Sequence, residues 1–445
     1  MYYLFAIASL LIYILAPMEY SWGYCCLCSV VYILNAIIGL LPSIKKGLIS
    51  FELIFTVALF LCSYLFPLVV YQVDSAYSLF SFGYNHQVIT KCTALVNVAY
   101  SFYWLGAYVS RNKYYKNFIA DRVFIDNHTI NVTANIVLFL FIICVALGGL
   151  EYYTDRYVGG NMSTNTSFSY VNSIFSTFAV LLSCSLYFAS TKKTFLKATI
   201  ILLAICVIIL FTGSRTLPMY VLLPLLFCFQ KKYDMSAAKM GVGLLALMAI
   251  FIIIGQVRHS VITLDSIASF QSSQSSIGVY DNFIDFIVNN RNLYDIYDSV
   301  EQDGYLYGKN FLSSILSVIP FSQGIVSNIF NIPYWQMDSA YFCTYKVLGN
   351  NPSLGLGTHV VGDVYLAAGV PGVIILFYLL GVFVTKVKNG AEMRNNAFLY
   401  VTYAFMVSYA VFMCRGSFFG PVRGILWSAL ILAVMNSFRR RRKYS

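Results

Sequence analysis

Five arginines stand where a charged side chain is costly and is therefore a candidate for function. Four lie at the ends of long apolar segments and one lies in an amphipathic stretch: Arg215, Arg258, Arg415 and Arg423, and Arg291. Guanidinium groups bind phosphate oxygens through paired N–H donors, so this set predicts a site for a phosphorylated substrate. The alternative is that each arginine merely extends its side chain to a membrane surface.

Arg215 has the most informative local sequence. It stands in Phe211-Thr-Gly-Ser-Arg-Thr-Leu-Pro218, a polar break between two apolar runs with almost no connecting loop. Such a turn holds the guanidinium beside the N-terminus of the following helix, and both are positive, which favours an anion such as phosphate. Arg258 and His259 directly follow another apolar run, so we count Arg258 as a catalytic candidate with Arg215 and His259 as a substrate-binding candidate.

His359 and Asp363 are four residues apart, and Asp363 opens an apolar run. If the helix extends back to His359, both side chains lie on one face and the carboxylate can orient the imidazole. This pair predicts a general base that works near neutral pH. The alternative is a polar pair at a helix N-terminus, where aspartate is favoured in any case.

Composition sets the class of protein that carries these residues. Of 445 residues, 59% are hydrophobic and 11% are charged, and the mean hydropathy is +0.73. Too few polar residues remain to cover a soluble fold, so we expect an all-α polytopic membrane protein. The net charge of +11 then reports topology, and no nucleic-acid partner is expected.

Twelve apolar segments are long enough, or nearly so, to span a membrane. They lie at about 2–16, 22–42, 51–73, 93–110, 133–150, 171–190, 195–212, 216–230, 239–256, 364–384, 397–414 and 419–436. Lys and Arg gather in the segments that face the cytoplasm if both termini lie inside. The basic tail 437–445 is then cytoplasmic, and 257–363 forms one large extracytoplasmic loop between the ninth and tenth spans.

The large loop has its own pattern. Apolar and acidic residues alternate over 279–300 as in an amphipathic helix, which we expect to break near 289–292. Arg291 can pair there with Asp295 at i+4. A second apolar piece, 311–330, is predicted to be re-entrant or interfacial.

Several familiar motifs do not occur in the chain. It has no glycine-rich phosphate loop, HExxH, nucleophile elbow, Asp-x-Asp pair or cluster of CxxC motifs, and Cys25, Cys26 and Cys28 lie inside an apolar segment, so we expect no metal and no cofactor. The arginines would then do what a divalent metal does in many sugar transferases and hold a diphosphate.

Two stretches resemble bacterial O-antigen polymerases of the Wzy type and the related O-antigen ligases. They are Phe211-Thr-Gly-Ser-Arg-Thr and the segment that begins at His359-Val-Val-Gly-Asp-Val-Tyr. Their order along the chain also agrees, with a large outside loop before the histidine and three spans after it. Val360 departs from the pattern, since many members have asparagine there.

The resemblance implies an inner-membrane glycosyltransferase that joins undecaprenyl-diphosphate-linked oligosaccharides for O-antigen or capsule. It implies that Arg215 and Arg258 bind the diphosphate and that His359 activates the acceptor hydroxyl. A chain-length regulator and a flippase are the expected partners. Two alternatives stay open: a ligase that shares this chemistry, and a flippase, against which the single large loop and the lack of internal repeats argue.

Overall fold

The computed structural model describes residues 1–44, 47–73, 84–113, 124–150, 166–257, 284–350, 355–394 and 396–444. Within these ranges every regular element is a helix. The elements are α1 (Tyr2–Leu15), α2 (Trp22–Ile44), α3 (Phe51–Leu65), η1 (Phe66–Val70), α4 (Tyr71–Val73), η3 (His86–Val88), α5 (Ile89–Val109), α6 (Asn127–Ala146), α8 (Thr166–Ser185), η5 (Leu186–Phe188), α9 (Lys192–Phe211), α10 (Thr216–Tyr233), α11 (Ala237–Val257), α13 (Ile284–Asp303), η8 (Lys309–Phe311), α14 (Leu312–Leu316), α15 (Ser322–Phe330), α16 (Tyr334–Met337), α17 (Ser339–Leu348), α18 (Val360–Arg394), α19 (Ala397–Cys414) and α20 (Pro421–Tyr444).

Seven helices in the described part of the chain are long and apolar enough to cross a membrane. They are Trp22–Pro42, Phe51–Val73, Asn127–Ala146, Tyr170–Phe188, Lys192–Phe211, Val360–Glu392 and Ala397–Cys414, joined by the shorter apolar helices Tyr2–Leu15, Ala237–Leu247 and Pro421–Ser437. The predicted class, an all-helical polytopic membrane protein, is confirmed. The predicted count of twelve is confirmed only in part. Seven of the twelve segments are candidate spans, three are the shorter apolar helices, and α5 and α10 are helical without belonging to either group.

Short polar residues begin several of these helices. Ser50, Asp126, Thr191 and Asn396 each accept a hydrogen bond from the backbone N–H three residues further on. Such caps satisfy donors that a helix start leaves without partners, so they define where each apolar helix begins.

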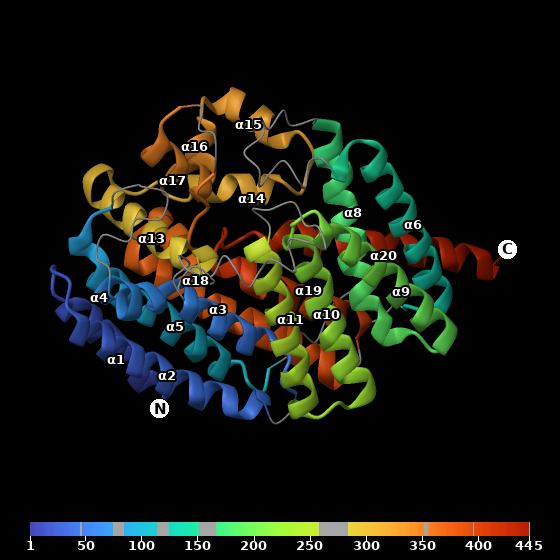
Figure 1. Ribbon diagram of the computed structural model, residues 1–445, viewed down its shortest axis with the longest axis horizontal. Helices are drawn as coiled ribbons and strands as arrows, with labels where there is room; N and C mark the ends of the chain where they lie inside the picture. Colours follow the sequence, from blue (N-terminus) through green and yellow to red (C-terminus); the bar gives the residue numbers. More distant parts are fainter. Residues whose placement is uncertain are drawn as a thin grey trace.

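The helices are arranged in groups around α18 and α19 (Figure 1). Of the helices of the large loop, α14 to α17 lie in the upper part of the view and α13 lies below them at the left; α1 and α2 lie at the lower left, and α6, α8 and α9 lie at the right. At the centre α5 packs tightly on α18. A Cβ atom at Gly106 would collide with the backbone of Tyr378, and one at Gly381 with the backbone of Tyr103. These glycines let the two backbones touch, as small residues do between membrane helices.

α18 is not one straight helix. Helical geometry breaks at Ala368 and Gly369. Both sides of this break contact α3, because Lys388 bonds Glu52 and His359 bonds Ser63. The two α3 residues are separated by about 16 Å along their helix, whereas a straight helix from His359 to Lys388 would measure about 43 Å. The break therefore folds the first eight residues of α18 back, which brings His359 against α3.

Candidate functional site

His359 is fully buried, and its ring takes two partners. Its Nε2 lies 3.0 Å from the hydroxyl of Ser63, which stands near the end of α3. Its Nδ1 accepts the backbone N–H of Val361 at 3.2 Å. Because Nδ1 is an acceptor in this arrangement, the ring proton sits on Nε2 and points to the Ser63 oxygen.

Burial also determines the charge of this histidine. Removal from water disfavours the imidazolium and lowers the pKa of His359 to about 3. The ring is therefore neutral at physiological pH. It is a hydrogen-bond donor through Nε2 in the structure, and it can act as a base only on a nitrogen whose lone pair is released.

The expected pairing of Asp363 with the His359 imidazole is wrong. The Asp363 carboxylate takes other partners, since Oδ1 accepts from Asn310 Nδ2 at 2.8 Å and Oδ2 accepts from the backbone N–H of Phe418 at 2.8 Å and from the Ser417 hydroxyl at 3.2 Å. The physical reason is that three donors surround the carboxylate, whereas the imidazole already bonds its own backbone.

Asp363 instead joins two parts of the site. It is fully buried in the first turn of α18, and its backbone N–H bonds the His359 carbonyl at 2.7 Å. Its carboxylate holds the turn between α19 and α20, which begins at Arg415. A buried carboxylate is retained where several N–H and O–H donors meet it. Asp363 thus fixes His359 and the Arg415 turn in one arrangement.

Two of the predicted arginines, Arg415 and Arg423, lie near the half-buried Tyr220 of α10. Arg215 is the N-cap residue of α10, and Tyr220 lies in the next turn of that helix. Arg415 and Arg423 both act electrostatically on the Tyr220 hydroxyl. Arg423 also lies over the Trp427 ring, with its Cζ 5.7 Å from the ring centroid. The end of α19 and the start of α20 therefore place positive charge near Tyr220, five residues after the N-cap residue Arg215 of α10.

Arg291 reaches the site from α13. Its Nε lies 3.2 Å from Asp295 Oδ2, which confirms the predicted i+4 pair, and only 5% of the Arg291 side chain is exposed. The neighbouring Asn292 donates to the Leu356 carbonyl at 2.8 Å and so attaches α13 to the segment that leads into His359. The predicted break near 289–292 is wrong, because α13 runs without interruption over residues that are all buried.

Two sets of residues remain: predicted residues that the structure does not describe, and site residues that were not predicted. Arg258 and His259 lie outside the described residues. Ser63, Asn310 and Tyr220 belong to the site, but the sequence did not single them out. Each stands in an ordinary polar or aromatic context, and only the long-range folding of α3, η8 and α10 shows their role. Within the described ranges, no group of three or more His, Cys, Asp or Glu side chains gathers as a metal site would require.

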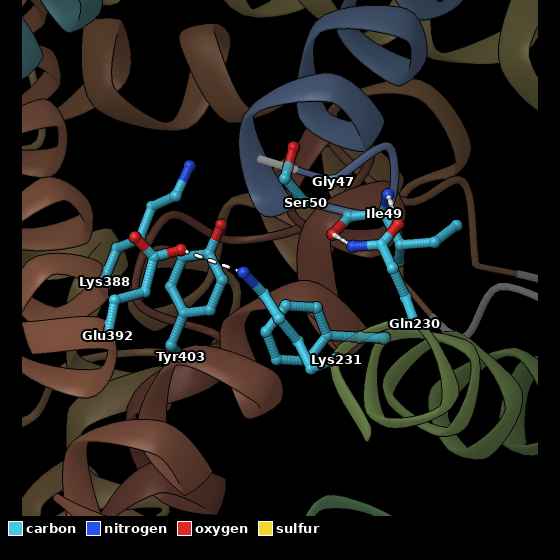
Figure 2. Close-up of a pocket in the computed structure, with 9 residues that line it drawn as sticks. Gly47, Ile49, Ser50, Gln230, Lys231, Lys388, Glu392 and Tyr403 are labelled. Atoms are coloured by element: carbon cyan, nitrogen blue, oxygen red, sulfur yellow. Dashed lines mark hydrogen bonds and ion pairs between the residues drawn. The ribbon is translucent and has the colours of Figure 1, made fainter. Parts of the chain in front are cut away.

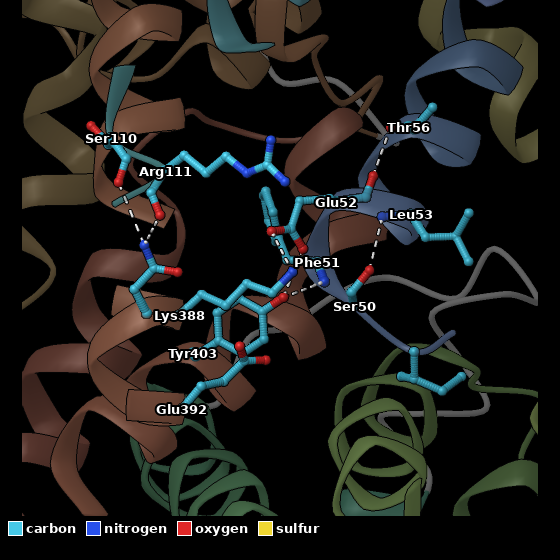
Figure 3. Close-up of polar contacts among 12 residues, drawn as sticks. Ser50, Phe51, Glu52, Leu53, Thr56, Ser110, Arg111, Lys388, Glu392 and Tyr403 are labelled. Atoms are coloured by element: carbon cyan, nitrogen blue, oxygen red, sulfur yellow. Dashed lines mark hydrogen bonds and ion pairs between the residues drawn. The ribbon is translucent and has the colours of Figure 1, made fainter. Parts of the chain in front are cut away.

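A small pocket lies at the other end of α3, and none of the described site residues lines it (Figure 2). There the Gln230 amide accepts the Ile49 N–H at 2.7 Å and donates to its carbonyl at 3.3 Å. Beside it Lys388 pairs with Glu52 at 2.9 Å, and Tyr403 donates to the same carboxylate at 2.7 Å (Figure 3). This network ties α3, α18 and α19 together at the end away from His359.

Comparison with known proteins gives one match. The family model described as O-antigen polysaccharide polymerase Wzy matches residues 1–438. No curated protein and no solved structure matches the chain.

Proposed function

The chain belongs to the O-antigen polysaccharide polymerase Wzy family, whose members polymerise lipid-linked repeat units in the inner membrane, and from this we propose how it performs the reaction. The enzyme is a glycosyltransferase that uses two lipid-linked oligosaccharides. A hydroxyl oxygen at the end of one glycan attacks the anomeric carbon of the sugar on the second. The bond from that carbon to the diphosphate breaks, and the polyprenyl diphosphate leaves with the electron pair.

His359 receives the hydroxyl proton in this proposal. The incoming hydroxyl takes the place of Ser63 at Nε2. For Nε2 to accept a proton, the ring proton must first move to Nδ1, and the 3.2 Å contact from the Val361 N–H must open. The low pKa of buried His359 keeps the ring unprotonated at neutral pH but also makes it a weak base, so the proposal requires that the bound diphosphate, an anion, raises this pKa in the reacting complex.

The arginines stabilise the leaving diphosphate. Arg415 and Arg423 lie near Tyr220, and Arg215 caps the same helix five residues before it. Arg291 lies on α13, whose Asn292 bonds the segment that leads into His359. Charge builds up on the diphosphate as the sugar bond breaks, and preorganised guanidinium groups in a poorly hydrated site stabilise that charge. Arg258 and His259, which follow α11 in the sequence, are proposed to complete this set.

One observation carries the proposal. The Asp363 carboxylate holds the short helix behind His359 and the turn behind Arg415 through bonds of 2.8 Å to Asn310 and to Phe418. A proton acceptor and an anion-binding group are thereby kept at a constant separation. Such fixed placement of two groups with different roles is what a transfer between two bound substrates requires.

The topology and partners follow as further parts of the proposal. We place the site on the extracytoplasmic side, with twelve spans, both termini in the cytoplasm and residues 257–363 covering the site. The carrier is undecaprenyl diphosphate, a flippase delivers it, and a chain-length regulator acts on the product.

The test uses purified protein in liposomes with a lipid-linked repeat unit, and the polymer ladder is measured on a gel. His359→Ala and Arg215→Ala should leave single repeat units. His359→Gln separates two roles of the ring, because glutamine can donate a hydrogen bond but is not a base. A residual ladder with His359→Gln would show that His359 acts as a hydrogen-bond donor, and it would overturn the proposal that His359 acts as a base.

Another histidine of the chain, His86, provides a matched control. His86 bonds the Tyr71 hydroxyl through Nδ1 at 2.8 Å, and it is exposed, whereas His359 is fully buried. His86→Ala should retain the full ladder. Equal losses in His86→Ala and His359→Ala would overturn the specific role of His359.

A further inference from the structure

The helix α15 exposes large apolar side chains and directs polar ones toward the protein, which is the reverse of a helix on a water-exposed surface. Two of its polar side chains face the protein, whereas Asn328 is exposed. Gln323 Nε2 donates to the Ser313 carbonyl at 2.7 Å, and Ser327, only 8% exposed, donates to the Ile332 carbonyl at 2.8 Å. Its large apolar side chains face outward, since Ile325 is 57% exposed and Ile329 is 66% exposed. A helix on a soluble surface shows the opposite pattern.

The exposed apolar residues continue along the preceding turns. Together they form what we call the apolar ridge: Ile315, Ile319, Phe321, Ile325, Ile329 and Phe330. Leaving one such side chain in water forgoes about 1.5–3 kcal/mol of burial energy. An exposed apolar patch of this extent marks a surface that something covers.

The position of the ridge identifies the covering material. Phe321 packs on Tyr170, with ring centroids 4.9 Å apart, and Tyr170 is the first residue of a candidate span. The Trp427 indole donates to the Val318 carbonyl at 2.9 Å, and Trp427 lies in the apolar helix Pro421–Ser437. The ridge therefore starts where two apolar helices begin, and indole and phenol rings gather at that level of a membrane.

The amino-acid composition of the segment also indicates contact with lipid. From Phe311 to Met337 the sequence contains no Asp, Glu, Lys, Arg or His. A protein partner would normally be met by a polar rim with charged groups, whereas hydrocarbon requires none. The Ser314 hydroxyl lies 2.9 Å from that of Ser417, so the segment is on the same side of the bundle as Asp363 and its turn.

We propose that the apolar ridge lies in the membrane leaflet on the His359 side, with Ile325 and Ile329 among the lipid acyl chains. The large loop is thus anchored in the bilayer as well as to the helices. Because η8 and α14 precede α15 directly, this anchor sets the depth at which Asn310 meets Asp363.

The experiment places the photoreactive residue benzoylphenylalanine at Ile325 or Ile329 in native membranes, followed by mass analysis of the adducts. Phospholipid adducts are expected at both positions. The matched control is Gln302, which is exposed at the polar end of α13 and should give no phospholipid adduct. Adducts to another protein, or no phospholipid adduct at either ridge position, would overturn the proposal.

A second measurement does not depend on the photoreactive residue. Ile329→Trp adds one indole to the protein, and its fluorescence is obtained by subtracting the wild-type signal. Phospholipids with brominated acyl chains should quench the fluorescence of the introduced indole in liposomes. If that fluorescence is not quenched, the proposal is overturned. Both readouts report lipid contact and not polymerisation, so they can fail while the proposed function holds.

Discussion

The hydroxyl of Ser63 lies 3.0 Å from Nε2 of His359, although 296 positions separate the two residues in the sequence. Ser63 is buried one turn before η1, the π-helical turn that follows α3. Such turns are frequent at functional sites. The contact gives His359 a partner at the nitrogen that the acceptor hydroxyl is proposed to reach, so Ser63 marks the position that this hydroxyl would take.

Ser63→Ala should therefore separate stability from activity. It leaves the buried Nε2–H of His359 without an acceptor, which costs about 1–3 kcal/mol of folding free energy. The polymerisation rate should stay near that of wild type, because substrate replaces Ser63 in the reacting complex. Thermal unfolding in detergent and the ladder assay check the two parts. A loss of rate as complete as that of His359→Ala would show that Ser63 itself takes part in the reaction.

Asp363→Asn should lower kcat/KM by about 10- to 100-fold, which corresponds to one or two lost hydrogen bonds at a buried site. The carboxylate accepts from three donors, whereas a carboxamide has one acceptor oxygen and would turn its NH2 toward one of them. Asn310→Ala is the matched control, because it removes one donor and keeps the bonds from Ser417 and Phe418. It should have the smaller effect, and the reverse order would contradict the role of Asp363 as the clamp for the Arg415 turn.

The sequence was informative about residues with strong local chemistry. Arg215 and His359 stand at abrupt changes from apolar to polar composition. The change at Arg215 predicted the start of α10 at Thr216, whereas α18 begins at Val360, four residues before the predicted span 364–384. Side-chain pairing was harder to predict, because spacing of i+4 allows a contact without requiring it. Arg291 and Asp295 form their pair, whereas His359 and Asp363 do not, since donors from η8 and from the Arg415 turn reach Asp363 first. Those donors are distant in sequence.

Substrate binding should weaken as pH rises through about 7, and Asp295 is the reason. Burial raises the pKa of Asp295 from 3.8 to about 7, against the opposing effect of Arg291 and with a further rise from Asp298. Below that pH the carboxyl is neutral, so the Arg291 charge is less compensated and attracts the diphosphate more strongly. KM for the lipid-linked substrate should therefore increase between pH 6 and 8. Asp295→Asn should have a flatter profile.

The same group predicts a stability effect of defined sign. Between about pH 4 and pH 7 the folded protein holds a proton on Asp295 that the unfolded chain has released. Folding stability from this group therefore falls as pH rises through that window and is constant above it. The difference in unfolding temperature between wild type and Asp295→Asn should change across the window. A constant difference would contradict the raised pKa.

Lys388→Met should be strongly destabilising, whereas the double variant Lys388→Met with Glu52→Leu should be close to wild type. The single change leaves the buried Glu52 carboxylate without its cation, and breaking a buried pair in this way costs about 3–5 kcal/mol. Replacing both partners by apolar side chains removes the uncompensated charge. Thermal unfolding of the two single variants and the double variant checks this. A double variant whose loss equals the sum of the single losses would show that the 2.9 Å contact contributes no coupling.

Gly369→Ala should abolish polymerisation while the protein still inserts into the membrane. Gly369 has φ +63°, a conformation that L side chains rarely adopt, and a Cβ there would lie 2.7 Å from the Tyr305 hydroxyl and 2.8 Å from its Cζ. The substitution opposes the bend that folds His359 back against Ser63. Tyr305→Ala removes the ring that the Cβ meets but not the backbone strain, so the double variant should recover part of the ladder. Full activity of Gly369→Ala would contradict the requirement for the bend, and the ladder assay on the three variants decides between these outcomes.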